Sequence, residues 1–297
     1  MSSSIASNLS ERIHAIDRFQ MRRPRLSAAV AVLKKYSDDQ GAHMGALIAF
    51  YAFFSIVPLL LAFVTILGFV LQGNREAQDS VLHSTLSQFP IIGTQLQANV
   101  HSIKGSPVSL AIGVVGSLLA GLGLTGAAQN TFNRVWAVPA DRRPSFVGWR
   151  LRGLATIAGL GLLAIVSTAA AGFVTATTGG AVAVLAGVLL ALAGNLLLFF
   201  LVFRLMTVEE VPTRDLLPGV LLATVLWQIL QHLGSYYVDH VVRHARDTSG
   251  LFAFVLGLLT WLYLGGQVTV IAAELNVVRA RRLWPRSLFA RSPPDPG

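Results

Sequence analysis

Long stretches without a charged side chain alternate with short charged segments along this chain. The uncharged windows cover residues 40–74, 105–133, 153–203, 216–238 and 248–273. A helix needs about 20 apolar residues to cross the hydrocarbon layer, so 153–203 has room for two helices and each other window for one. A turn-forming run, TTGG at 177–180, divides the long window near its middle. The pattern predicts six transmembrane helices, over about 46–71, 106–128, 153–176, 181–203, 216–238 and 250–273.

Composition supports a membrane protein and excludes several other classes. Apolar residues make up 54% of the 297 residues and charged residues only 12%, with a mean hydropathy of +0.63. Soluble domains carry about 25% charged residues, so a soluble globule is excluded. The chain has no cysteine, which excludes disulfides, thiol nucleophiles and cysteine-based metal sites. We therefore expect an all-α, polytopic membrane protein, a bundle of six transmembrane helices.

The basic residues predict the orientation. If the N-terminus is cytoplasmic, 19 of the 23 Lys and Arg residues fall in inside segments and 4 in outside segments. The inside segments are then 1–42, 129–152, 204–214 and 274–297. This asymmetry explains the net charge of +9 without a nucleic-acid partner, and it points instead to anionic lipid headgroups at the cytoplasmic face. Both termini are predicted to be cytoplasmic.

The chain divides into three parts on this interpretation. Residues 1–42 form a basic amphipathic arm, 43–280 the six-helix domain, and 281–297 a basic, proline-containing tail. Arginine-rich arms can bind RNA, but beside a first span the membrane surface is the better fit. Apolar side chains on either side of Pro90 predict short amphipathic extracytoplasmic helices within 76–104. The arm has no apolar core of signal-peptide type, so no cleavage is expected.

Several motifs together resemble the YihY/BrkB family of bacterial inner-membrane proteins, historically labelled ribonuclease BN-like. They are AFYAFFSIVP at 49–58, QNTFNRVW at 129–136, VPTRDLLPG at 211–219, WLYL at 261–264 and AELN at 273–276. The resemblance runs from about residue 40 to 280. It implies six spans and a multi-pass protein of the cell inner membrane, and it implies no defined reaction.

Ionisable and amide side chains at the cytoplasmic ends of two spans form the first candidate site. Arg134 follows Asn130 and Asn133 at the end of the second span, and Glu274 precedes Asn276 at the end of the sixth. Their place in the motifs favours an inward-facing polar cluster with an Arg134–Glu274 pair that binds an anionic headgroup. The alternative is that both charged side chains snorkel to the interface.

Polar side chains within the spans form a second candidate site, a cavity. Its expected lining is Asn195, Gln228, His232 and Gln267, since amide and imidazole groups are disfavoured against lipid and should turn inward. Hydrogen bonding between helices is the other interpretation. In the first span, Pro58 breaks the hydrogen-bond ladder and predicts a hinge, with Ser55 available to bond the freed carbonyl; a simple packing kink is the alternative.

No catalytic constellation is visible. A nuclease needs clustered carboxylates or a histidine pair, and the cytoplasmic acids are scattered. His240 and His244 are one helical turn apart but lack a third ligand, so no metal site and no cofactor are predicted. The sequence therefore predicts a transporter or lipid-handling protein rather than an enzyme. The alternative is a non-transporting scaffold for envelope assembly, with envelope proteins as partners.

Overall fold

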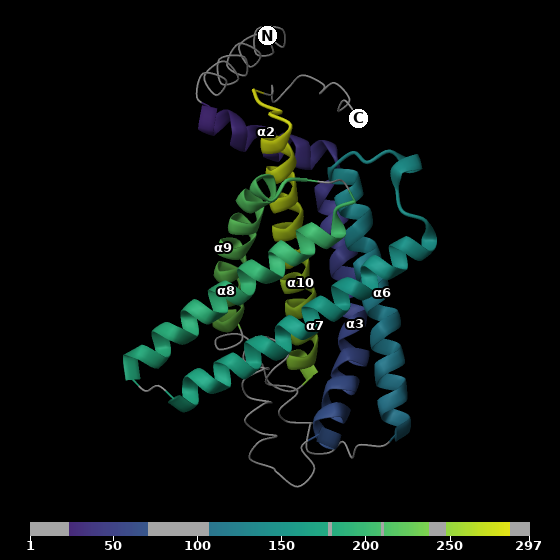
Figure 1. The fold of residues 1–297 in the computed structure, drawn as a ribbon, viewed down its shortest axis with the longest axis vertical. Coiled ribbons are helices and arrows are strands. Elements are labelled where there is room, and N and C mark those ends of the chain that lie inside the picture. Colours follow the sequence, from purple (N-terminus) through teal and green to yellow (C-terminus); the bar gives the residue numbers. More distant parts are fainter. Residues whose placement is uncertain (1–23, 71–106, 178–179, 209–210, 238–247, 286–297) are drawn as a thin grey trace.

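All regular structure in the described part of the chain is helical. The computed structural model describes residues 24–70, 107–177, 180–208, 211–237 and 248–285 (Figure 1). The helices are α2 (Pro24–Asp38), α3 (Gly41–Val70), α6 (Pro107–Val135), the short 3-10 helix η2 (Ala140–Arg142), α7 (Phe146–Thr177), α8 (Gly180–Met206), α9 (Thr213–Tyr237) and α10 (Thr248–Ala280). These ranges contain no strand, and the all-α prediction is confirmed.

Five of these helices contain segments long and apolar enough to cross a bilayer. The segments are Ala111–Val135, Phe146–Val174, Gly180–Met206, Thr213–Gly234 and Val255–Ala280. In α3 the described apolar part, Gly41–Ile56, is shorter than a span, although the helix itself runs for 30 residues. A multi-pass membrane protein is thereby confirmed, whereas the sixth span and the orientation stay predictions.

The turn expected in the long uncharged window separates α7 from α8. α7 ends at Thr177 and α8 begins at Gly180. The φ angle of Gly180 is +60°, a conformation that glycine adopts without the steric cost that a Cβ imposes. The TTGG run therefore ends one helix and starts the next.

α10 is the central helix of the bundle. It packs against α2, α3, α6 and α9, and it carries the buried residues Val270 and Val277. Phe132 of α6 and Phe203 of α8 meet beside them, with ring centroids 5.2 Å apart. The backbones of α3 and α10 approach closely, because a Cβ on Gly266 would lie 2.5 Å from the Gly45 carbonyl oxygen. Such small-residue contacts are typical of helix pairs in membranes.

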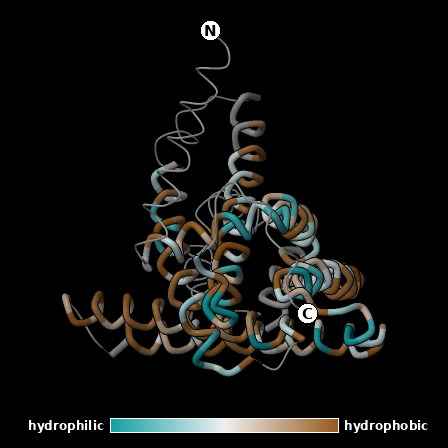
Figure 2. Tube along the Cα trace, turned by 90° about the horizontal axis from the view of Figure 1, so that it is seen from above, coloured by the Kyte–Doolittle hydropathy of each residue, from teal (hydrophilic) through white to brown (hydrophobic). Residues whose placement is uncertain are grey.

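The α7–α8 hairpin diverges from the other helices. Figures 1 and 2 show the two helices side by side, with their joined end projecting away from α3, α6, α9 and α10. In the most apolar part of each helix, none of α7 and only 6% of α8 is buried. Lipid tails are as apolar as the side chains, so this hairpin needs no protein partner to cover it. The expected single bundle is therefore four packed helices and a splayed pair.

α2 lies across one end of the bundle, at the top of Figure 1. We refer to this as the α2 end, where α3, α7 and α9 begin and α6, α8 and α10 finish. The buried face of α2 carries Ala31 and Val32, which pack against Val278 of α10. Leu33 points away and is 60% exposed. The amphipathic arm thus contributes one helix that docks on the bundle.

The structure shows the local geometry at Pro58 and Ser55, whereas the hinge itself stays a prediction. α3 continues as a helix through Pro58, so the proline does not break it. A Cβ on Gly116 of α6 would lie 3.1 Å from the Pro58 side chain, which shows how closely the two helices pack there. Ser55 Oγ donates to the Ala52 carbonyl at 2.7 Å and not to the carbonyl that Pro58 leaves free, that of Phe54.

The expected segment at 76–104 and the pair His240 and His244 lie outside the described residues.

Topology can be tested directly. A reporter fused after Gly297 is expected to read as cytoplasmic, and one inserted beside Gln88 as extracytoplasmic, because the basic residues gather on one side of the predicted spans. Paired alkaline phosphatase and green fluorescent protein fusions would measure this. A cytoplasmic signal at Gln88 would refute both the orientation and the six-span count.

Candidate functional site

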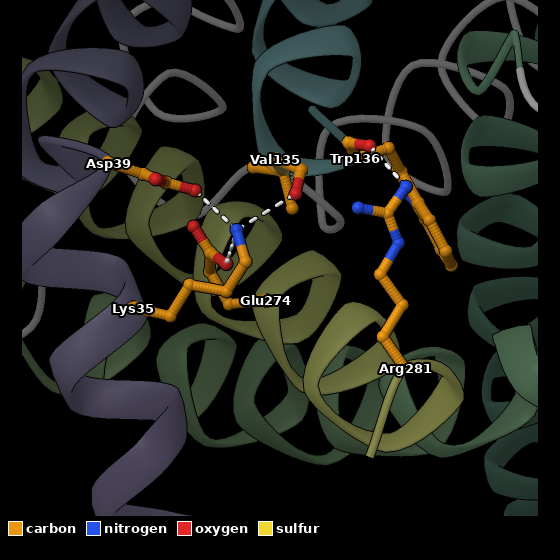
Figure 3. A network of polar contacts seen from close by, with 6 residues as sticks. All are labelled: Lys35, Asp39, Val135, Trp136, Glu274 and Arg281. Carbon is orange, nitrogen blue, oxygen red and sulfur yellow. Dashed lines mark hydrogen bonds and ion pairs between the residues drawn. The ribbon is translucent and has the colours of Figure 1, made fainter. Parts of the chain in front are cut away.

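A lysine with almost no exposed surface lies where α2, α6 and α10 meet. Lys35 is in the last turn of α2, and its side chain is 1% exposed. Its Nζ donates to Asp39 Oδ2 at 2.5 Å and to the Val135 carbonyl at 2.9 Å, and it lies 3.2 Å from Glu274 Oε2 (Figure 3). An ammonium has three N–H donors. Asp39 and the Val135 carbonyl each accept one of them, and Glu274 lies within ion-pair distance of the same nitrogen.

Glu274 is the most deeply buried acid of this cluster. Its side chain is 0% exposed and comes from α10. The contact with Lys35 is electrostatic, because neither carboxylate oxygen receives a hydrogen bond of normal geometry. A buried carboxyl group without its full set of hydrogen bonds is unusual and calls for an explanation.

Three cationic side chains bind carbonyls at the end of α6 and in the connection that follows it. Helices leave their last carbonyls without internal partners and carry partial negative charge there. Lys35 binds the Val135 carbonyl, Arg281 Nη2 donates to the Trp136 carbonyl at 2.7 Å, and Arg143 Nε donates to the Val138 carbonyl at 3.2 Å. The Arg281 guanidinium also lies 6.0 Å from the centroid of the Trp136 ring (Figure 3). α2 and α10 are thus both tied to the same helix end.

Gln267 forms a second link at the α2 end. The Tyr36 hydroxyl of α2 donates to Gln267 Oε1, and Gln267 Nε2 donates to the Ala42 carbonyl of α3 at 3.2 Å. Gly45 leaves space for this amide, since a Cβ there would lie 2.3 Å from Gln267 Nε2. Gln267 was expected to line a cavity, and the structure places it in contacts between three helices.

The two asparagines expected beside Arg134 and Glu274 are both buried. Asn276 is 1% exposed, and its Oδ1 accepts a hydrogen bond from the Gly219 backbone N–H of α9 at 2.6 Å. Asn133 is 3% exposed, and its Oδ1 has no hydrogen-bond partner. Asn276 therefore joins α9 to α10 rather than facing a ligand.

The expected Arg134–Glu274 pair is not formed. Glu274 pairs with Lys35, whereas the Arg134 side chain is exposed and its Nη2 lies 3.4 Å from Gln40 Oε1. Arg134 follows Asn130 by four residues, and both lie on the exposed face of α6, whereas Glu274 of α10 is buried. The polar cluster predicted around these residues is thus divided between the interior and the surface.

A pocket of about 200 Å³ opens beside that exposed face. It lies between α3, α6 and α7, and Asn130 and Arg150 line it near the α2 end. Leu47, Tyr51 and Leu122 line the part farther from that end. Arg150 is exposed, with its guanidinium 5.2 Å from the Phe146 ring centroid. The pocket therefore combines a polar, cationic mouth with an apolar wall.

Gln129 forms part of the same pocket. It is 0% exposed, and its Nε2 donates to the Trp149 carbonyl at 3.3 Å. Its Oε1 has no hydrogen-bond partner. Since a carbonyl accepts only, the bond to Trp149 fixes which end of the amide is the nitrogen. The pocket wall thus contains an acceptor oxygen that nothing in the described structure satisfies.

Two of the expected cavity residues line a groove of about 590 Å³ between α8 and α9. They are Gln228, which is partly buried, and His232, which is exposed rather than turned inward. His232 Nδ1 lies 2.7 Å from the Gln228 carbonyl oxygen and donates to it. Asn195 is partly exposed on α8 and is not among the residues that line the groove.

Sequence reasoning missed Lys35 and Asp39. Their i, i+4 spacing is a signal for a helical ion pair, but Lys34 and Asp38 share it one residue earlier. Only the rotation of α2 on the bundle decides which lysine is buried. The single visible hint is that Lys35 lies four residues after the buried Ala31.

Comparisons with known proteins agree with the membrane setting. A UPF0761 membrane protein of Pseudoalteromonas atlantica (strain T6c / ATCC BAA-1087) is 25% identical over 268 residues, which cover 86% of this chain and 87% of the relative. A UPF0761 membrane protein of Xanthomonas axonopodis pv. citri (strain 306) is 26% identical over 293 residues, which cover 94% of this chain and 67% of that relative. One of Prosthecochloris aestuarii (strain DSM 271 / SK 413) is 27% identical over 262 residues, covering 84% and 61%. No solved structure matches the chain.

The family comparison covers most of the sequence. The profile described as Virulence factor BrkB matches residues 32–294, which include the second half of α2, all the apolar helices and the Lys35–Glu274 contact. The matched range contains every motif on which the resemblance was based, so that expectation is confirmed. This chain belongs to the virulence factor BrkB family of membrane proteins.

Proposed function

We propose that the protein is a transporter of the bacterial inner membrane that binds lipid-like amphiphiles by an anionic headgroup. The pocket between α3, α6 and α7 supports this best, because its lining changes from polar to apolar along the helices. Asn130 and Arg150 lie near the α2 end, and Leu122 lies two helical turns deeper on α6. A phospholipid has the same order of polarity from headgroup to chain.

The exposed cations near the pocket suit a phosphate group. Arg150 lines the pocket, and Arg134 lies one turn beyond Asn130 on the same face of α6. A guanidinium offers a planar fork of donors that matches phosphate oxygens. On the predicted orientation this end faces the cytoplasmic leaflet, whose anionic lipids attract basic groups. The proposed ligand therefore enters from the inner leaflet.

The α7–α8 hairpin supports movement of the amphiphile as well as binding. α7 borders the pocket, and α8 borders the groove that contains Gln228 and His232. The groove lies in the half of the helices away from the α2 end. The hairpin is attached to the bundle mainly near the α2 end. A rotation of the hairpin about this attachment would therefore change the openings of the pocket and of the groove together. The proposal needs no catalytic group and assigns no reaction.

Substitution of the two exposed arginines tests the binding step. Arg134→Ala and Arg150→Ala are each expected to weaken the binding of a short-chain phosphatidylglycerol by about tenfold, because a hydrogen bond to a charged group contributes about 1.5 kcal/mol or more. Arg134→Lys should restore binding only in part, since an ammonium lacks the planar fork. Microscale thermophoresis on the purified protein would measure the affinity.

Arg142 provides the matched control. It is an exposed arginine of η2 in the same connection, outside the pocket lining, so Arg142→Ala should leave binding unchanged. Arg143 looks equivalent in the sequence, but its bond to the Val138 carbonyl makes it unsuitable. Equal and mild effects at Arg134, Arg142 and Arg150 would show that these residues only orient the chain.

Reconstitution separates transport from binding. Liposomes that contain the protein are expected to move a fluorescent phosphatidylglycerol between leaflets faster than empty liposomes, and Arg134→Ala should reduce that rate. Binding without movement would instead favour the non-transporting scaffold. The exposed apolar surface of the α7–α8 hairpin would then be the natural surface for an envelope-protein partner.

A further inference from the structure

The buried cluster at the α2 end contains more acid than base. Lys35 Nζ lies 2.5 Å from Asp39 Oδ2 and 3.2 Å from Glu274 Oε2, and both carboxylates point toward it in Figure 3. One ammonium and two carboxylates have a formal charge of −1 when all three are ionised. The side chains of Lys35, Asp39 and Glu274 are 1%, 24% and 0% exposed. Water therefore reaches this cluster mainly at Asp39.

Glu274 is the member of this cluster whose negative charge would be balanced least by hydrogen bonds or water. Asp39 makes the shorter contact with Lys35 and has water on its exposed side. Within the described residues, neither oxygen of Glu274 accepts a hydrogen bond of normal geometry, and no part of its side chain is exposed. Carboxylates in such surroundings become neutral by taking up a proton rather than staying charged. A proton, unlike a larger cation, requires no additional space between the packed helices. Its uptake brings the formal charge of the cluster to zero.

The neighbouring groups of α2 and α6 do not supply the missing positive charge. From α2, Tyr36 faces Glu274, and burial, together with the nearby Tyr263 and Glu274, raises the pKa of the Tyr36 hydroxyl. That phenol therefore stays uncharged at neutral pH. From α6, the group that reaches Lys35 is the Val135 carbonyl, which is an uncharged acceptor.

The nearby cations are directed elsewhere. Arg134 of α6 is exposed and lies beside Gln40. Arg281, which follows α10, donates to the Trp136 carbonyl. His43 of α3 is exposed. Lys35 is thus the cation that the structure places against the two acids.

We propose that Glu274 is a proton-binding site and that the packed position of α2 is the state that holds the proton. When Glu274 gives its proton to water by way of the exposed side of Asp39, an unbalanced carboxylate remains between α2 and α10. Hydration of that carboxylate favours separation of the two helices. Since the packed state binds the proton more tightly, low pH favours packing and rising pH favours release. This inference does not depend on the amphiphile pocket.

Cysteine labelling of α2 tests the inference in the full-length protein, which has no natural cysteine. Ala31 is 0% exposed against α10, and Leu33 is 60% exposed on the other face. The maleimide labelling rate of Ala31→Cys divided by that of Leu33→Cys cancels the pH dependence of the thiol itself. In nanodiscs, this ratio is expected to rise by about tenfold as the pH is raised through neutrality, within the usual range for coupled sites.

Two substitutions should remove the pH dependence by different routes. Glu274→Gln mimics the protonated acid, and Asp39→Asn removes the excess negative charge while leaving Glu274 in place. Both should give a low ratio at every pH. Asp38→Asn is the matched control: Asp38 pairs with the partly exposed Lys34, so this variant should retain the rise.

Three results would overturn the inference. The ratio could fail to change with pH in the otherwise unaltered protein, or the rise could persist in Glu274→Gln. The third result is a lower labelling ratio when sodium replaces a bulky organic cation in the buffer at constant pH. It would show that a metal cation, and not a proton, balances the negative charge of the cluster. Infrared difference spectra give an independent check on the unlabelled protein, because a protonated carboxyl band should appear at low pH and be missing in Glu274→Gln.

Discussion

Replacing Lys35 by methionine is expected to lower the free energy of unfolding by about 3–5 kcal/mol, the usual loss when one partner of a buried ion pair is removed. The substitution leaves the Asp39 carboxylate and the buried Glu274 carboxyl group without the ammonium, and it removes the donor to the Val135 carbonyl. Methionine retains most of the volume, so packing changes little. Thermal unfolding of the purified protein in detergent would measure the loss.

Lys34 provides the matched control for this prediction. Its Nζ lies 3.2 Å from Asp38 Oδ1, but the two side chains are 21% and 33% exposed. Such helical surface pairs contribute less than about 1 kcal/mol, so Lys34→Met should unfold close to the wild-type temperature. Adding Asp39→Asn to Lys35→Met should restore part of the loss, because it removes the carboxylate that has lost its ammonium. Equal effects of the two lysine substitutions would contradict the buried position of Lys35.

Substitution of Gly266 by alanine is expected to destabilise the protein by about 1–3 kcal/mol, the usual range for overpacking. The new Cβ would lie 2.5 Å from the carbonyl oxygen of Gly45, and backbone cannot move aside as a flexible side chain can. α3 and α10 would have to separate, which would also strain the contact between Gln267 and the Ala42 carbonyl. The unfolding temperature in detergent is the appropriate measurement.

Gly172 of α7 distinguishes this steric effect from a general effect of removing glycine. Within the described residues, no atom other than those of its own helix neighbours lies within 4 Å of the position that a Cβ would take. Gly172→Ala should therefore stabilise the helix slightly, because alanine has the higher helix propensity. If Gly266→Ala behaved like Gly172→Ala, the close approach of α3 and α10 would be wrong.

Five of the six expected spans were predictable because the bilayer sets their length, whereas the arrangement of the helices was not. Lipid tails and apolar side chains are equivalent solvents, so nothing in α7 and α8 indicated that they would diverge from the bundle. The ends of the helices could not be predicted from the sequence either. α6 continues to Val135 through polar residues, and it is followed by Ala137 in the left-handed conformation (φ 48°), where no glycine marks the end.

The candidate site was predictable by residue type but not by partner. Glu274 stood out because it ends a long uncharged window, yet its partner is Lys35 and not Arg134. That partner lies at the opposite end of the sequence, and its burial depends on how α2 rotates against α10. Gln267 and Asn276 were also selected correctly as unusual polar residues. Sequence could not show that their hydrogen bonds join helices rather than face a ligand.

The central position of α10 has a consequence for the order of assembly. α2, α3, α6 and α9 all precede α10 in the chain, and all of them pack against it. Chains emerge from the ribosome N-terminus first, so these four helices are synthesised before α10, the helix against which they all pack. Until then Lys35 has no Glu274 to approach, and the Gly219 N–H has no Asn276. The central helix of the bundle is therefore added last, and a nascent chain that ends before Thr248 leaves α2 without its contacts to α10.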